Sequence, residues 1–203
     1  MPDRFPTALL FGAPGAGKGT QGKILGQIPG FFHLSCGDVF RNLDIHSPLG
    51  ETFFEYSSKG ELVPDDVTVA MWHENLKAQQ TLSLYRPHAD LLVLDGIPRN
   101  RTQAEMLNDH IDVRCIVHLM CNDMEAMLVR LRKRALRENR PDDAREEVIR
   151  HRWEVYEQET RPVLEFYPDE VIREVDAIAS PAGVLQHALE ALVPIHDELF
   201  GTS

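Results

Sequence analysis

The sequence predicts an α/β fold in which helices cover both faces of a parallel, five-stranded sheet. Five short apolar runs are separated by segments of helix length, which is typical of buried parallel strands joined by crossover helices. These runs are residues 8–11, 32–34, 91–94, 115–120 and 171–175. A glycine-rich turn follows the first run directly and precedes a helical pattern. Because ligands of such sheets bind at the carboxyl ends of the strands, we expect the functional site there.

The chain is long enough to bury a full core without a partner, since it has 203 residues. Its formal net charge is −11, so a broad basic surface for nucleic acid is not expected. The first residues contain no apolar segment of a signal peptide, and no stretch approaches about 20 uninterrupted apolar residues. We therefore expect a cytoplasmic monomer that binds neither nucleic acid nor a membrane.

The cysteine pattern indicates neither a disulfide framework nor a zinc site. Cys36, Cys115 and Cys121 are odd in number, form no CxxC pair and make no tight cluster with histidine. We expect three small side chains that are buried or half-buried.

Two helices can be placed from their local patterns. Asp65 or Asp66, directly after Pro64, is predicted to be the N-cap of a helix that continues to Leu76. The segment 123–137 has the helical period, with apolar residues on one side and arginines on the other. The packing residues are Met127, Leu128 and Leu131, and the arginines are Arg130, Arg134 and Arg137.

Two segments have the character of insertions over the carboxyl edge of the sheet. Residues 39–68 are polar and contain Gly50, Gly60 and Pro64, and residues 135–143 are short and charged. Either segment suits a mobile flap. The core of a single domain over residues 1–203 would then consist of residues 1–38, 69–134 and 144–203.

The strongest motif is the glycine-rich turn from Gly12 to Thr20. It satisfies G-x-x-x-x-G-K through Gly17 and Lys18, although Gly19 stands where Ser or Thr usually follows and Thr20 comes one place later. Backbone N–H groups of such a turn curl around phosphate oxygens, and the next helix adds its positive N-terminal end. Since the lysine can reach the β- and γ-phosphates, the motif predicts a nucleotide triphosphate site.

Together with four further blocks, this motif resembles the adenylate kinase family. The blocks are HLSCGDVFR at 33–41, GELVPD at 60–65, LDGIPR at 94–99 with QAE at 103–105, and RPDD at 140–143 continuing through Arg152, Tyr156 and Thr160. They follow the family order over roughly residues 7–175. The resemblance implies a P-loop NTPase-type fold with an acceptor-binding insertion at 39–68 and a short lid at 135–143. It also implies reversible phosphoryl transfer from MgATP to AMP, giving two ADP.

By this resemblance, arginines hold the phosphates of both nucleotides. Phosphoryl transfer needs donor and acceptor to be aligned and the charge on the transferring oxygens to be neutralised. A planar guanidinium suits this task because it binds phosphate through two hydrogen bonds. Arg41 and Arg99 would hold the α-phosphate of the acceptor. The catalytic residues that the resemblance implies are Lys18, Arg99, Arg134, Arg140 and Arg152.

The resemblance also assigns the two nucleotide sites and the metal. The ATP-binding residues would be Gly15, Ala16, Gly17, Lys18, Gly19, Thr20, Arg130 and Arg134. The AMP-binding residues would be Cys36, Arg41, Glu61, Leu62, Val63, Gly96, Arg99, Gln103, Arg140 and Arg152. Asp95 ends an apolar run and would position Mg²⁺ through bound water. Arg137 has no match in the motifs and is expected in solvent, and His33 is expected to pack beside the site.

Three residues depart from the pattern of adenylate kinases and bear on the acceptor. Cys36 and Asn100 stand where Thr is common, and Ile97 stands where Phe is usual. The similar uridylate-cytidylate kinases also have Asn after the arginine, but they lack an amide at the position of Gln103. An amide offers a donor and an acceptor to the edge of adenine, which favours AMP over a pyrimidine nucleotide.

A third interpretation is a nucleotide-binding regulator that closes on its ligand without catalysis. Lys18, Arg99, Arg134 and Arg152 are all retained, and binding alone would not need so complete a cage. The lid between Arg134 and Arg140 is short and contains no cysteine, which resembles the short-lid forms. We therefore expect an enzyme that uses Mg²⁺ and no zinc.

Overall fold

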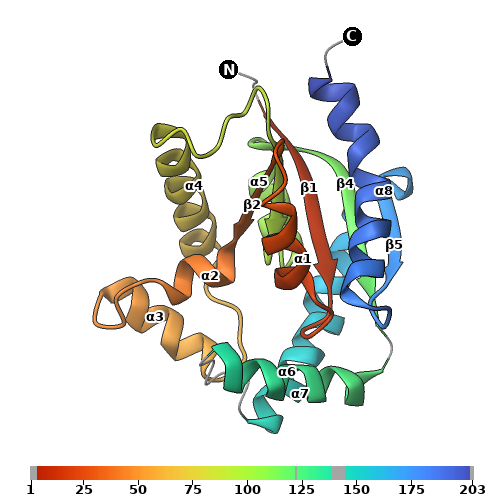
Figure 1. Ribbon diagram of the computed structural model, residues 1–203. Coiled ribbons are helices and arrows are strands. Elements are labelled where there is room, and N and C mark those ends of the chain that lie inside the picture. Colours follow the sequence, from red (N-terminus) through yellow and green to blue (C-terminus); the bar gives the residue numbers. More distant parts are fainter. Residues whose placement is uncertain (1–3, 122, 139–144, 202–203) are drawn as a thin grey trace.

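The computed structural model of the protein describes residues 4–121, 123–138 and 145–201. Five parallel strands form one sheet in the order β2-β3-β1-β4-β5, with helices on both faces (Figure 1). The strands are β1 (Phe5–Gly12), β2 (Phe31–Ser35), β3 (Leu91–Asp95), β4 (Ile111–Met120) and β5 (Ile172–Asp176). Four of the apolar runs lie within strands and the run 171–175 overlaps β5 from residue 172, so the predicted sheet is confirmed.

Eight α-helices and three short helical turns connect and follow these strands in the described part of the chain. The α-helices are α1 (Lys18–Leu25), α2 (Cys36–Arg41), α3 (Pro48–Ser57), α4 (Asp65–Thr81), α5 (Arg101–Leu107), α6 (Met124–Glu138), α7 (Glu146–Val155) and α8 (Pro181–Phe200). A π-helical turn η2 (Tyr156–Thr160) and two 3₁₀ turns, η3 (Arg161–Phe166) and η4 (Asp169–Val171), lead from α7 to β5.

The two faces of the sheet carry separate hydrophobic cores. Side chains alternate along β1: Leu9 and Phe11 belong to the core that includes Trp72 of α4, whereas Ala8 and Leu10 belong to the core shared with α1 and α8. Figure 1 shows α1 and α8 in front of the sheet, α5 behind it and α4 at the left, beside the β2 edge. The sheet is thus buried between helices, as the near-continuous apolar runs predict.

The register of the central strands brings polar groups to one edge of the sheet. Leu10 of β1 and Ser35 of β2 both pair with Asp95, the last residue of β3. Gly12 ends β1 two residues beyond Leu10 and begins the glycine-rich turn. The carboxyl ends of three strands therefore meet beside this turn, where parallel sheets bind their ligands.

The edge strand β5 corrects one expectation, because it is not buried along its length. Val175 is buried, but Arg173 and Glu174 are exposed. Within the described residues, β5 pairs with β4 alone, so one side of it has no neighbouring strand.

The predicted N-cap of α4 is wrong. Pro64 occupies the capping position and offers no side-chain acceptor, while Asp65 and Asp66 are the first two helical residues. Both carboxylates still lie in the first turn, where they complement the positive end of the helix. Asp65 has a tertiary role instead, since its Oδ1 accepts hydrogen bonds from Asn100 and Gln103. The helix extends beyond Leu76 to Thr81.

Helix α6 has the two faces that the sequence predicts. Met127, Leu128 and Leu131 are buried, and Arg137 is exposed. Of the segment predicted as a lid, residues 135–138 continue α6, and residues 139–143 lie outside the described residues. The boundaries of the lid therefore stay a prediction.

The three cysteines are free thiols, with Cys36 and Cys115 buried and Cys121 half-buried, as expected. Among the described helices, none is both long and apolar enough to cross a membrane.

Candidate functional site

The turn between β1 and α1 has the backbone of an anion site. Gly12, Gly15 and Gly17 have φ values of 142°, 88° and 102°, which L-residues with side chains rarely adopt. In the described part of the chain, no side chain caps the start of α1, and its first turn contains no acidic residue. The N–H groups and the positive end of the helix are therefore left to attract an anion from outside.

Lys18 lies at the start of α1 and reaches back over this turn. Its Nζ donates hydrogen bonds to the backbone oxygens of Gly12, at 2.6 Å, and Ala13, at 3.1 Å. Burial lowers the pKa of the Lys18 ammonium to about 8, against the opposing effect of Asp95. A phosphate beside this lysine would restore its usual pKa, because the phosphate supplies the negative charge that the site lacks.

Several charged residues converge on Lys18 from separate elements. Asp95 ends β3 and Arg99 follows it, while Arg134 lies on α6 and Arg152 on α7. The three arginines each lower the pKa of Lys18 electrostatically. Residues that are over a hundred positions apart in the chain thus act on one charge at the edge of the sheet.

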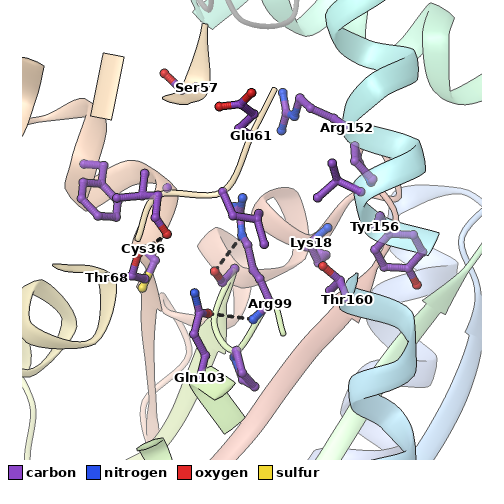
Figure 2. A pocket seen from close by; sticks show the side chains of 18 of the residues that line it. Lys18, Cys36, Ser57, Glu61, Thr68, Arg99, Gln103, Arg152, Tyr156 and Thr160 are labelled. Carbon is purple, nitrogen blue, oxygen red and sulfur yellow. Dashed lines mark hydrogen bonds between the residues drawn. The ribbon is translucent and has the colours of Figure 1, made fainter. Parts of the chain in front are cut away.

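Lys18 lines a cleft at this edge of the sheet (Figure 2). Its lining includes nine of the residues predicted to bind AMP, which are Cys36, Arg41, Glu61, Leu62, Val63, Gly96, Arg99, Gln103 and Arg152. Arg140, predicted to act in both catalysis and AMP binding, lies outside the described residues.

Arg99 is held across the cleft by the turn that precedes it. Its Nε donates to the backbone oxygen of Gly96 at 2.9 Å, and burial lowers the pKa of its guanidinium, with Arg152 acting in the same direction. Gly96 has a φ of 81°, and a Cβ at this position would lie 3.2 Å from Nη2 of Arg99. Glycine is therefore needed both for the backbone and for the approach of the arginine.

The amide of Gln103 is fixed on both sides at the base of the cleft. The side chain is 1% exposed. Its Oε1 accepts a hydrogen bond from the backbone N–H of Arg99 at 2.8 Å, and its Nε2 donates to Oδ1 of Asp65 at 2.8 Å. An amide has two N–H groups and two acceptor positions, so one of each is left for a ligand.

The second predicted acceptor arginine is oriented by a carboxylate. Nη1 of Arg41 donates to Oδ1 of Asp38 at 3.3 Å, and Nζ of Lys23 lies 3.5 Å from Oδ2 of the same carboxylate. Gly37 makes room for the guanidinium, because a Cβ there would lie 2.8 Å from Nη1. Cys36, on the same helix, is buried, and burial raises the pKa of its thiol to about 12, so it stays neutral.

Asp95, predicted to position Mg²⁺, is a buried carboxylate beside the first turn of α1. It is 7% exposed, and a Cβ at Gly19 of α1 would lie 3.6 Å from its Oδ2. His33 Nε2 lies 4.0 Å away, and burial lowers the pKa of this imidazole. His33 also packs against Gly22 and Gly26, as its predicted packing role requires. The described residues contain no group of three acidic, histidine or cysteine side chains that could hold a metal ion.

Arg130 points to a different place from the other arginines. Its Nη1 donates to the backbone oxygen of Ala177 at 2.8 Å. Gln21 of α1 donates to the backbone oxygen of Pro181 at 3.0 Å. The connection 177–181 between β5 and α8 therefore lies between α6 and α1, away from the acceptor residues.

Comparison with known proteins agrees with this geometry. The family model "Adenylate kinase" matches residues 10–172. The chain belongs to the adenylate kinase family. An adenylate kinase of Thermobifida fusca is 38% identical over 190 residues, covering 91% of this chain and 96% of the relative. An adenylate kinase of Nocardia farcinica is 38% identical over 193 residues, covering 91% and 97%. One of Thermus thermophilus is 35% identical over 190 residues, covering 91% and 95%.

Within this family, Asn100 departs from the usual threonine for a reason that the structure supplies. Its Oδ1 accepts the hydrogen bond from the backbone N–H of Gln103 at 2.8 Å, which caps α5. Its Nδ2 donates to Asp65 at 2.9 Å, a bond that the hydroxyl of threonine is too short to copy in the same way. The asparagine therefore has a structural role that does not depend on a pyrimidine acceptor.

Several residues of this adenylate kinase cleft were not identified from the sequence. Tyr156 and Thr160 line it from the two ends of η2, and Phe40, Phe53, Ser57 and Thr68 line it from the insertion side. Tyr156 is held from β4, since its hydroxyl lies 3.3 Å from Nε2 of the buried His118. Tyr156 and Thr160 belong to one of the family blocks, but they were not predicted to line the site. The π-helical turn between them has no sequence periodicity from which it could be predicted.

Proposed function

We propose that the protein is an adenylate kinase that transfers the terminal phosphoryl group of MgATP to AMP, reversibly, giving two ADP. The observation that carries this proposal is that Lys18, Arg99 and Arg152 line one cleft beside the glycine-rich turn, while Arg134 also acts on the charge of Lys18. Membership of the family supports the same reaction.

The protein's part in the reaction is to align two nucleotides and to neutralise charge. The turn at the start of α1 and Lys18 would hold the donor phosphates, while Arg41 and Arg99 would hold the phosphate of AMP. Arg134 and Arg152 would lie on the transferring group between them. No general base is needed, because the attacking phosphate oxygen of AMP is already an anion.

Mg²⁺ would belong to the donor. It usually keeps several waters and binds through one or two carboxylates together with substrate phosphates. Asp95 is a single buried carboxylate next to the first turn of α1, which fits this kind of site. The ion would supply charge neutralisation on the β- and γ-phosphates of ATP, and Asp95 would orient it through bound water.

Residues 39–68 would form the acceptor insertion and residues 135–143 the short lid. The insertion contributes Arg41, Glu61, Leu62 and Val63 to the cleft, which supports this assignment. The donor base would lie near Arg130 and the connection 177–181, since Arg130 is directed there. We also propose that the protein is monomeric and lies in the cytoplasm. The free thiols of the described cysteines agree with a reducing compartment.

The test is a coupled assay of ADP formation from ATP with AMP, CMP, UMP or GMP as the acceptor. We expect the largest kcat/KM with AMP and no turnover in the Lys18→Met variant, with an unchanged circular dichroism spectrum. A preference for CMP or UMP would make the protein a pyrimidine nucleotide kinase. Tight nucleotide binding without turnover would instead make it a regulator.

A further inference from the structure

A partly buried polar clamp joins the first turn of α4 to α5 beside the acceptor cleft. Oδ1 of Asp65 accepts two hydrogen bonds, from Nδ2 of Asn100 at 2.9 Å and from Nε2 of Gln103 at 2.8 Å. On its other side, Oε1 of Gln103 accepts from the backbone N–H of Arg99 at 2.8 Å, the bond drawn as a dashed line in Figure 2. Asp65 is 35 and 38 positions from its two donors, so only the folded chain forms this clamp.

The partners of Gln103 determine which way its amide faces. The backbone N–H of Arg99 can only donate, and the carboxylate of Asp65, when ionised, can only accept. Turning the amide by 180° would place its NH₂ against an N–H and its oxygen against a carboxylate. Both hydrogen bonds would then be replaced by repulsive contacts in a buried place, which is costly.

The fixed amide has one N–H and one acceptor position left, in a defined order. The edge of adenine presents an amino donor next to a ring nitrogen acceptor. Hypoxanthine, the base of inosine monophosphate (IMP), has the same ring size but presents an oxygen acceptor next to an N–H donor. An amide locked in one orientation pairs with the edge of adenine and meets like groups on the edge of hypoxanthine. An amide that is free to turn can pair with either base.

We propose that Asp65, supported by Asn100, is a positioning residue that, together with the backbone N–H of Arg99, sets acceptor specificity by locking the amide of Gln103 in the orientation that adenine requires. This inference rests on the proposed function, because it needs AMP to be the acceptor and Gln103 to contact its base. Asp65 does not touch the nucleotide in this account. It acts through Gln103, and it makes the specificity of the cleft depend on the packing of α4 against α5.

The experiment compares AMP and IMP as acceptors in the parent and in Asp65→Ala, Asp65→Asn and Asp66→Ala. Asp66 is the matched control, since it is the exposed neighbour in the same helical turn and its replacement removes the same charge from the helix start. We expect Asp65→Ala to raise KM for AMP about tenfold and to lower KM for IMP, with kcat and the KM for ATP little changed. Asp65→Asn keeps an oxygen acceptor and should retain most of the preference for AMP.

A variant that loses discrimination because it is poorly folded would lose kcat with both acceptors and would not gain affinity for IMP. Should Asp65→Ala fail to fold, Asp65→Ser takes its place, since a hydroxyl can either donate or accept and cannot dictate the orientation of the amide. The inference is overturned if the AMP to IMP ratio of kcat/KM in these variants stays equal to that of Asp66→Ala. If the parent itself phosphorylates neither purine nucleotide, it is the proposed function that fails.

Discussion

Lys18 should take up a proton when ATP binds at alkaline pH. Its pKa in the free protein is about 8, against an ordinary value of 10.5, because the ammonium is buried beside three arginines. Donor phosphates would reverse this shift by supplying negative charge. If the pKa then returns to its ordinary value, binding takes up about 0.1 proton at pH 7 and about 0.9 proton at pH 9. The affinity for ATP should fall about fivefold from pH 8 to 9 and about sevenfold from pH 9 to 10, and it should level off above about pH 10.5.

The assay is isothermal titration calorimetry with a non-hydrolysable ATP analogue, in two buffers of different ionisation enthalpy at each pH. The difference in apparent enthalpy between the buffers gives the number of protons taken up. Lys18→Met is the control, because it removes the titrating group. Equal enthalpies in the two buffers at pH 9, or the same uptake in Lys18→Met, would refute the assignment of this proton to Lys18.

Three further predictions rest on named contacts. Gly96→Ala should lower the free energy of unfolding by about 1–2 kcal/mol in urea titrations, because φ at this position is 81°. The same change should reduce kcat/KM for AMP, because the new methyl group displaces Arg99. An unchanged kcat/KM would contradict the role given to that turn. Gln103→Ala should raise KM for AMP more than KM for ATP and narrow the preference for AMP over CMP. The expected loss of binding free energy for AMP is roughly 1–3 kcal/mol. If the ratio of kcat/KM for AMP and CMP does not change, Gln103 does not contact the base. Chelation of divalent ions should abolish turnover and leave the melting temperature of the free protein unchanged, since the described residues contain no clustered metal ligands; stoichiometric zinc after purification would count against this.

The sheet and the glycine-rich turn could be predicted because their signals are local. β3 and the central part of β1 are continuous apolar runs, and the positions that need a positive φ in the turn are glycines. The sequence predicts a buried strand at residues 171–175 because the run contains three aliphatic residues, and periodicity does not say that a strand lies at an edge. The cleft residues were found through family motifs, which record tertiary positions that local patterns do not contain.

The clamp at Asp65 was beyond local reasoning. An aspartate after a proline at the start of a helix has the usual signature of an N-cap, and nothing nearby in the sequence competes with that interpretation. Its actual partners, Asn100 and Gln103, are brought to it only when α4 packs against α5. For the same reason, Asn100 resembles a pyrimidine-kinase feature in the sequence, whereas the structure gives it two hydrogen bonds that explain its presence.

The central claim is that Lys18 and the arginines around it move a phosphoryl group from ATP to AMP. The most direct measurement is ³¹P NMR of the purified protein with ATP, AMP and Mg²⁺, followed in both directions. We predict that ATP and AMP disappear in equal amounts while two ADP form, that ADP alone regenerates both, and that Lys18→Met does neither. Release of inorganic phosphate without consumption of AMP, or spectra that do not change, would contradict the account.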